Sequence, residues 1–296
     1  MNLIQLFGAI ELGLLYGLVA LAIYLTFRVI NFPDLTVDGS FPLGAAVYAA
    51  LIVKGEFFNI PVGPLMATAL AIMAGALAGF VTGFLHVRLK ILGLLAGILT
   101  MTALYSVNLR IMGKPNIALS NEASLFGDPQ YVIWVLLLIV LGFVFLLQRF
   151  LKSQYGLALR GTGINPRVSP SYGVNTDHMT LVGLVISNGL VALAGALYAQ
   201  FQGFADISMG TGTLIYGLAA VIVGETLITS NYLSLILIST VLGSILYRIA
   251  IAFALNIHEF GLQTYDLNLI TAGLVVVALL FPRIKQKIKT WGRRAS

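Results

Sequence analysis

The residues best suited to chemistry in this chain lie in two short polar segments between long apolar runs. Residues 31–34 (NFPD) and 38–40 (DGS) bring two carboxylates, a proline and a glycine close together in sequence. Irregular backbone at membrane depth persists only where protein or water satisfies its polar groups, so these segments are candidates for lining a solute pathway. The alternative is an ordinary connection in which Asp34 and Asp38 cap helices.

Ionisable residues inside the apolar runs are few, namely Glu11, Glu225 and Arg248. Intramembrane charges are functional candidates by default, although each of these could reach an interface by snorkelling. A proton-driven carrier would be expected to show a denser relay of carboxylates, so the pattern argues against ion-driven transport.

Motifs of catalysis and of phosphate or metal binding are absent from the sequence. The chain has no Cys, and its three His residues stand alone without an HExxH pattern. Neither GxSxG nor GxxxxGK[ST] occurs. We therefore expect no catalytic residue, metal or cofactor in this chain, and any ATP and Mg²⁺ would be bound by a partner subunit.

Composition sets the environment of these residues. Of 296 residues, 59% are hydrophobic and only 9% are charged, against roughly 25% charged in soluble domains. This predicts an all-α integral membrane protein forming a single transmembrane domain over 1–296. At about 20 residues per helix we expect about nine spans, within a range of eight to ten. These are 5–27, 37–53, 62–85, 91–112, 131–150, 178–200, 213–229, 232–253 and 266–282.

The basic residues indicate the orientation. Most of the 17 Lys and Arg residues fall in alternate loops and in the tail 283–296, which predicts an outside N-terminus and a cytoplasmic C-terminus. Lys54, Arg110 and Lys114 are the exceptions that fall outside. Because the positive charge lies in short loops and a tail, we expect a lipid bilayer around the chain and no nucleic-acid partner.

Two parts of the chain resemble each other. Residues 20–45 align without gaps on 192–217, with matches that include Phe32 with Phe204 and Asp34 with Asp206. In the expected topology the two Phe-x-Asp turns face opposite sides, which is the pattern of an inverted repeat. We therefore predict such a repeat, with a short or broken second helix, although Ala and Leu matches also arise by chance.

The longest polar segment is 151–177, which we expect to be a cytoplasmic coupling loop. A short helix is predicted over 153–161, and Asn165 with Pro166 reads as an N-cap followed by proline. Pro170 should interrupt a helix that starts at Asn165, with a restart in which Ser169 is the cap. The alternative is a basic loop that only lies near anionic lipid.

At this loop the sequence resembles a known family. Residues 156–166 (GLALRGTGINP) resemble the coupling segment of branched-chain amino acid/ribose-type ABC importer permeases. The blocks 28–46, 99–116, 217–227 and 266–283 resemble a narrower tryptophan/tyrosine-type subgroup. The family usually continues after Asn-Pro with a helical run, and Pro170 departs from that pattern.

The resemblance implies a multi-pass permease of the bacterial inner membrane that imports a small solute, an aromatic or branched-chain amino acid being favoured. The implied partners are a cytosolic ABC ATPase dimer, a second permease subunit (identical or a close paralogue) and an extracytoplasmic solute-binding protein. A stand-alone carrier or channel is the alternative. The expected coupling residues are Tyr155, Gly156, Leu159, Arg160, Gly163, Asn165 and Pro166. The expected pathway residues are Asn31, Phe32, Asp34, Asp38, Tyr105 and Asn108.

Overall fold

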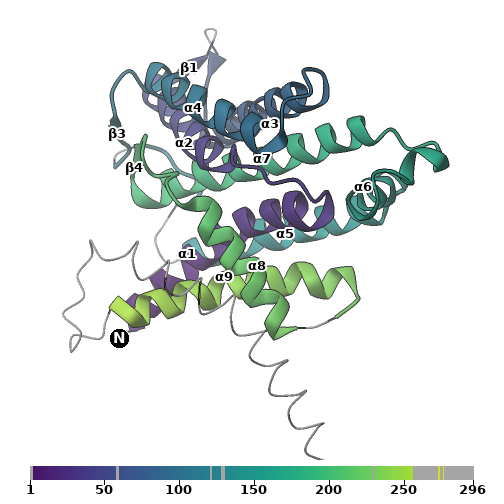
Figure 1. Ribbon diagram of the computed structural model, residues 1–296. Coiled ribbons are helices and arrows are strands. Elements are labelled where there is room, and N and C mark those ends of the chain that lie inside the picture. Colours follow the sequence, from purple (N-terminus) through teal and green to yellow (C-terminus); the bar gives the residue numbers. More distant parts are fainter. Residues whose placement is uncertain are drawn as a thin grey trace, which may run out of the picture.

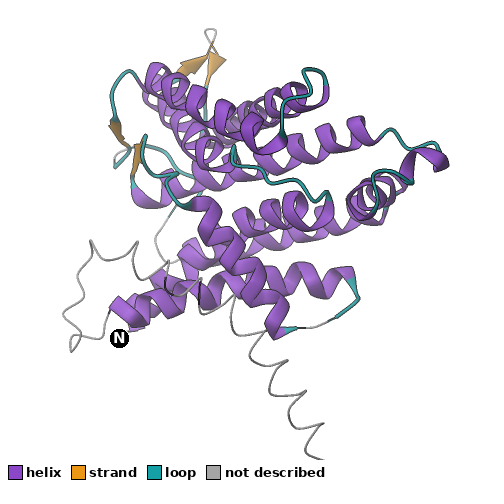
Figure 2. Cartoon of the chain, viewed as in Figure 1, coloured by secondary structure: helices purple, strands orange, loops and turns teal. Residues whose placement is uncertain are grey.

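The computed structural model describes residues 3–57, 60–120, 122–127, 131–228 and 230–255, with isolated helical positions at 273 and 276. Helices dominate these residues, and strands are confined to two short pairs (Figure 2). The helices of the first part are α1 (Leu3–Ile23), continued by the π-helix η1 (Tyr24–Val29), then α2 (Val37–Lys54), α3 (Pro64–Val87), α4 (Gly93–Met112) and α5 (Val132–Lys152). Those of the second part are α6 (Gln154–Ile164), the 3-10 helix η3 (Ser169–Tyr172), α7 (Thr176–Gln202), α8 (Thr213–Leu227) and α9 (Leu233–Leu255).

The strands form two antiparallel pairs outside the helices. Strand β1 (Glu56–Phe57) pairs with β2 (Ile60–Pro61) between α2 and α3. Strand β3 (Asn116–Ala118) pairs with β4 (Phe204–Asp206), with Ile117 opposite Ala205. The second pair links the end of α4 to the end of α7, two segments far apart in sequence.

The protein is an all-α integral membrane protein. Within the described residues, seven helical stretches are long and apolar enough to cross a bilayer, and α8 is a shorter apolar helix. The predicted spans between residues 5 and 253 are all confirmed as helices. The predicted span 266–282 and the basic tail 283–296 lie outside the described residues.

The second helix is short rather than broken. α2 has 18 residues, stays continuous through Pro42 and ends at Lys54, followed by Gly55, whose φ of 72° is left-handed. A proline inside a helix removes one backbone donor, so the carbonyl of Asp38 lacks its usual partner in α2. The backbone of Gly210 lies against this carbonyl and against the Pro42 ring, because a Cβ at Gly210 would overlap both.

Helices α1 and α7 lie antiparallel at the centre of the bundle (Figure 1). The Ser187 hydroxyl donates to the Ala22 carbonyl at 3.0 Å, and Gly183 packs against Ile30. Residue numbers therefore rise in one helix as they fall in the other. Fully buried leucines fill the space around this central pair, among them Leu18, Leu21, Leu184 and Leu197.

The first half of the chain packs on α7, the first long helix of the second half. α2 meets α7 where a Cβ at Gly44 would overlap the backbone of Ala192. α3 meets α7 where a Cβ at Gly75 would overlap the carbonyl of Asn188. Small residues permit these close backbone approaches.

The second half packs on α1 in the same manner. A Cβ at Gly217 of α8 would overlap the Ile23 side chain, and a Cβ at Gly13 of α1 would overlap the backbone of Ile245 in α9. The Ser244 hydroxyl of α9 also donates to the Gly13 carbonyl at 2.7 Å. The reciprocal packing and the antiparallel α1 and α7 agree with the predicted inverted repeat.

Candidate functional site

The helix outside the membrane spans, α6, begins at a sharp turn after α5. The Ser153 hydroxyl accepts a hydrogen bond from the Gly156 amide at 3.2 Å, which caps the first turn. A Cβ at Gly156 would overlap the Phe150 carbonyl oxygen. Gly156, one of the predicted coupling residues, thus lets α6 turn back tightly against the end of α5.

The inner face of α6 is seated on the end of α1. Leu159 is fully buried, and its side chain lies 3.6 Å from the position of a Cβ on Gly183. A Cβ at Gly163 would overlap the carbonyl oxygen of Val29, the last residue of η1. Leu159 and Gly163 therefore hold α6 in place and do not face outward, although both were expected to contribute to the coupling surface. π-Helical turns occur frequently at functional sites.

The outer face of α6 carries large side chains in solvent. Leu157 is 56% exposed and Ile164 83%, and their spacing of seven puts them on this face. Tyr155 is 63% exposed in the first turn, on another side of the helix. Exposed apolar groups gathered on one helix indicate a contact surface. Arg160 is half-buried beside them. Ile164 was not among the predicted residues, although its spacing of seven from Leu157 on a helix was a signal for a shared face.

The segment after α6 combines a capped turn with a short 3-10 helix. The Asn165 carboxamide oxygen accepts from the amides of Arg167 and Val168, each at 3.2 Å, so Asn165 caps a turn and not the predicted helix. Asn165 and Pro166 are exposed. The chain then forms a turn and η3, with no α-helix starting at Asn165. The helix that Asn165 was predicted to begin is absent, and η3 lies where the restart was expected, with Val168 and not Ser169 before it. The effect of Pro170 stays a prediction.

The first polar segment is organised around a buried carboxylate. Asp34 accepts from the Thr36 amide at 2.9 Å and from the Asn188 side chain at 2.7 Å. Asn188 in turn accepts from the Ser40 hydroxyl at 2.7 Å. Burial raises the pKa of Asp34, and the hydrogen bonds from Thr36 and Asn188 oppose that shift only in part. Asp34 therefore joins the beginning of α2 to the middle of α7.

The second carboxylate of the segment reaches across to the other half of the chain. Asp38, in the first turn of α2, accepts from the Leu214 amide at 2.8 Å and from the Gly212 amide at 3.3 Å. These donors lie at the beginning of α8, so Asp38 caps α8 as an N-cap residue would. The two helix N-termini meet here, and each helix runs away from the contact.

The corresponding turn of the second half repeats the first. Asp206 accepts from the Ser208 amide at 2.7 Å and from the Asn116 side chain at 3.3 Å. An amide two residues onward and an asparagine side chain thus bind each carboxylate of the aligned pair. Partial burial alone would raise the pKa of Asp206, but the hydrogen bonds from Ser208 and Asn116 outweigh it and lower the pKa.

The remaining predicted pathway residues divide between the surface and the interior. Asn31 is exposed with a left-handed φ of 53°, whereas Phe32 is buried with its ring centroid 5.1 Å from that of His86. Tyr105 is 57% exposed on α4. Asn108, one turn further along, is buried and donates to the Gly39 carbonyl at 3.3 Å. The structure therefore brings Asp34, Asp38 and Asn108 to the start of α2 and leaves Tyr105 on the outside.

Two charged contacts of the described residues had no signal in the local sequence. Arg28 of η1 forms an ion pair with Glu225 of α8. The Arg248 guanidinium lies over two rings, 4.0 Å from the Tyr16 centroid and 4.6 Å from that of Tyr216, an arrangement that stabilises a desolvated cation. Within the described residues, no group of three or more His, Cys, Asp or Glu side chains is placed to hold a metal ion.

Comparisons with known proteins agree with this arrangement. The family described as "Branched-chain amino acid transport system / permease component" matches residues 5–281. The chain is 42% identical to a tyrosine transport system permease protein of Clostridioides difficile, covering 90% of this chain and 88% of that one. It is 34% identical to an uncharacterized Rickettsia prowazekii protein (93% and 96% covered) and 25% identical to the ribose import permease protein RbsC of Escherichia coli (86% and 78%). No solved structure matches the chain.

Proposed function

We propose, since the chain belongs to the branched-chain amino acid transport permease family, that it is the transmembrane subunit of an ATP-driven importer for an amino acid. The observation that carries the proposal is α6, a helix outside the spans that is anchored on α1 and turns an apolar face outward. The partners are a cytosolic ABC ATPase dimer, a second permease subunit and an extracytoplasmic binding protein. The protein is a multi-pass component of the bacterial inner membrane.

The outer face of α6 is the proposed docking surface for the ATPase. Leu157 and Ile164 supply exposed apolar area on this face, and Tyr155 adds an exposed ring at the first turn of α6. A few buried anchors supply most of the binding energy of an interface, and Tyr is common among them. Arg160 adds a positive charge that would steer an acidic partner surface. This assignment puts α6 in the cytoplasm, with the N-terminus outside and the C-terminus inside.

The contact of α6 with η1 supplies the route for mechanical coupling. ATP-driven closure of the ATPase dimer would push on α6, and the contact of Gly163 with Val29 would transfer that movement to η1 and α1. Arg28 of η1 is paired with Glu225 of α8, so the second half of the bundle would follow. Closely packed elements transmit such displacements because they are poorly compressible.

We place the second permease subunit and the solute pathway against α4. Its exposed residues include Thr102, Tyr105 and Ser106, which share one face of the helix. The exposed residues of α5 are apolar over the corresponding depth, for example Leu138, Leu141 and Phe145. Polar groups are costly against lipid, so α5 suits the bilayer and α4 suits a protein or water contact.

An aromatic amino acid is the favoured cargo, because the C. difficile relative is named for tyrosine transport. The polar face of α4 offers Tyr105 for stacking on an aromatic ring. Ribose is the comparison substrate, since the more distant E. coli relative is named for it.

Co-purification and reconstitution test the proposal. The chain should pull down a cytosolic ATPase from membranes, and proteoliposomes with ATPase and binding protein should hydrolyse ATP faster with tyrosine than with leucine or ribose. A chain that transports alone, or that recruits no ATPase, would point to a carrier or channel.

Variants then test the docking surface. Arg160→Ala and Leu157→Ser should leave the chain in the membrane but weaken ATPase recruitment and uncouple hydrolysis from uptake. Arg88→Ala is the control, because Arg88 is an exposed cation in the connection between α3 and α4. Equal loss in Arg88→Ala, or normal uptake in both test variants, would contradict the assignment of α6.

A further inference from the structure

A groove of about 630 Å³ lies between α2, α3 and α4. Most of its lining is apolar, with Val47 and Leu51 from α2, Leu70, Met73 and Leu77 from α3, and Ile111 from α4. Met73 and Leu77 are also exposed, and they continue into the apolar outer face of α3 formed by Phe80 and Phe84. The groove therefore opens toward the hydrocarbon of the bilayer.

Two cations complete the lining of the groove. Lys54 is the last residue of α2, and Arg110 lies in the last turn of α4. Both side chains are exposed, and neither forms an ion pair with another side chain that the structure describes. Both residues line the groove, Lys54 from the end of α2 and Arg110 from α4.

These two cations lie on the side of the bundle where the chain has few other basic residues. The basic connection with Arg88 and Lys90 follows α3 and precedes α4, so it lies at the opposite end of α4 from Arg110. Lys and Arg are normally depleted on the side away from such connections. Two cations that line one apolar groove on this side fit a ligand that has both a negative charge and an apolar part.

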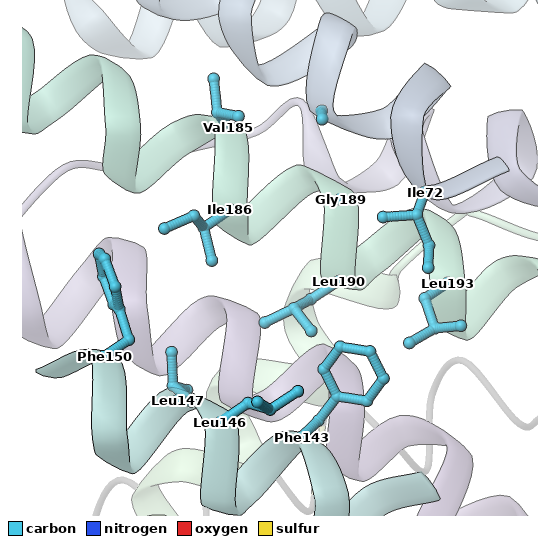
Figure 3. Close-up of a pocket in the computed structure, with 11 residues that line it drawn as sticks. Ile72, Phe143, Leu146, Leu147, Phe150, Val185, Ile186, Gly189, Leu190 and Leu193 are labelled. Atoms are coloured by element: carbon cyan, nitrogen blue, oxygen red, sulfur yellow. The ribbon is translucent and has the colours of Figure 1, made fainter. Parts of the chain in front are cut away.

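A second groove provides the comparison. It lies between α3, α5 and α7, measures about 460 Å³, and is lined by side chains such as Ile72, Phe143 and Leu190 (Figure 3). No charged residue among those that the structure describes contributes to its lining. Such a groove accepts hydrocarbon without distinguishing one lipid headgroup from another.

We propose that the groove between α2, α3 and α4 binds one anionic phospholipid. The headgroup phosphate lies between Lys54 and Arg110, and an acyl chain follows the apolar lining past Leu70 and Leu77. Basic side chains between transmembrane helices bind acidic headgroups in this way, and burial of the chain supplies the remaining affinity. The site lies beside the polar face of α4, and its occupancy requires neither a cargo nor ATP.

Native mass spectrometry of the full chain with its partner subunits tests the site. Phosphatidylglycerol and phosphatidylcholine are titrated separately into the detergent-solubilised protein, and bound lipid is counted. We expect phosphatidylglycerol to bind more tightly, and Lys54→Gln and Arg110→Gln each to weaken it about five-fold, as about 1 kcal/mol per basic residue implies. The double variant should lose about 25-fold, the product of the two single effects, while Lys114→Gln, a nearby exposed cation, should bind normally.

A second variant separates the groove from the charges. Met73→Trp leaves both cations in place but fills the exposed part of the groove, so it should also reduce phosphatidylglycerol binding. Equal binding of the two lipids, or a preference that survives in the double variant, would overturn the proposal. Competition by glycerol phosphate as strong as by the lipid would also overturn it, because a soluble anion would then suffice. The ATPase assays measure a different surface, so none of these lipid-binding results decides the proposed function.

Discussion

The carboxylate of Asp38, at the beginning of α2, accepts a hydrogen bond of 2.8 Å from the backbone amide of Leu214, at the beginning of α8. A residue of the first half thereby caps a helix of the second half. The two N-termini meet at this contact, where Gly210 also lies against the Asp38 carbonyl. Movement of one half relative to the other must therefore either carry this contact along or break it.

Asp38→Ala should destabilise the protein by about 1 kcal/mol, the usual cost of losing an N-cap. Asp38→Asn should lose less, because its carboxamide oxygen still accepts one amide. Thermal unfolding in detergent measures both. Asp177→Ala is the control, since Asp177 pairs with Lys90 on the exposed surface and such pairs contribute little. Equal stability of Asp38→Ala and the wild type would show that α8 does not depend on this cap.

Gly163→Ala should displace α6 from α1, because the added methyl group overlaps the Val29 carbonyl oxygen. Overpacking of this kind costs about 1–3 kcal/mol. We expect slower uptake per ATP hydrolysed in proteoliposomes. Gly161→Ala is the control, because it makes the same substitution in the same helix. Its Cβ would meet only the Ser169 hydroxyl, at 3.7 Å, which is an ordinary contact. A similar defect in both variants would mean that α6 needs glycine flexibility and not the close approach.

Asp34 and Asp206 should respond to pH in opposite directions. The pKa of Asp34 is raised above the ordinary value of 3.8, so its contribution to stability is full below pH 3.8 and is lost as the pH rises through the folded pKa. The pKa of Asp206 is lowered from the same ordinary value of 3.8, so its contribution is full above that pH and is lost as the pH falls through the folded pKa.

Unfolding temperatures of Asp34→Asn and Asp206→Asn between about pH 2 and pH 8 measure this difference. Relative to the wild type, Asp34→Asn should gain stability as the pH rises. Asp206→Asn should lose stability at neutral pH and approach the wild type as the pH falls. Parallel curves for the two variants would contradict the assigned environments of the carboxylates.

Pro170→Ala should extend regular helix through the segment after Asn165. The new amide could donate to the Pro166 carbonyl, a bond that proline cannot form. Hydrogen exchange should then show stronger protection over residues 167–172. Unchanged protection would mean that the Asn165 cap and the left-handed Gly173, with φ of 76°, determine this conformation without the proline.

The spans were predictable because long apolar runs leave few alternatives. Helix capping by Asp34 and Asp38 was one of two local interpretations, and only Asp38 caps a helix, α8. The partners of the two carboxylates, Asn188 and Leu214, lie more than 150 residues away. The inward side of α6 could not be read from the sequence, since Leu157 and Leu159 are both apolar and only packing against distant segments such as α7 buries Leu159. No sequence pattern indicated the π-helix η1.

The reciprocal packing of the two halves constrains how the chain is made. Residues 1–152 leave the ribosome before α7, so Asp34 then lacks Asn188, and the glycine faces of α2 and α3 lack the helix on which they close. The early helices can enter the bilayer singly, but they reach their final positions only after the helices of the second half are made. Assembly of this protein is thus completed late in synthesis, and a chain cut between its halves would expose small-residue faces and a buried carboxylate to the quality-control proteases of the membrane.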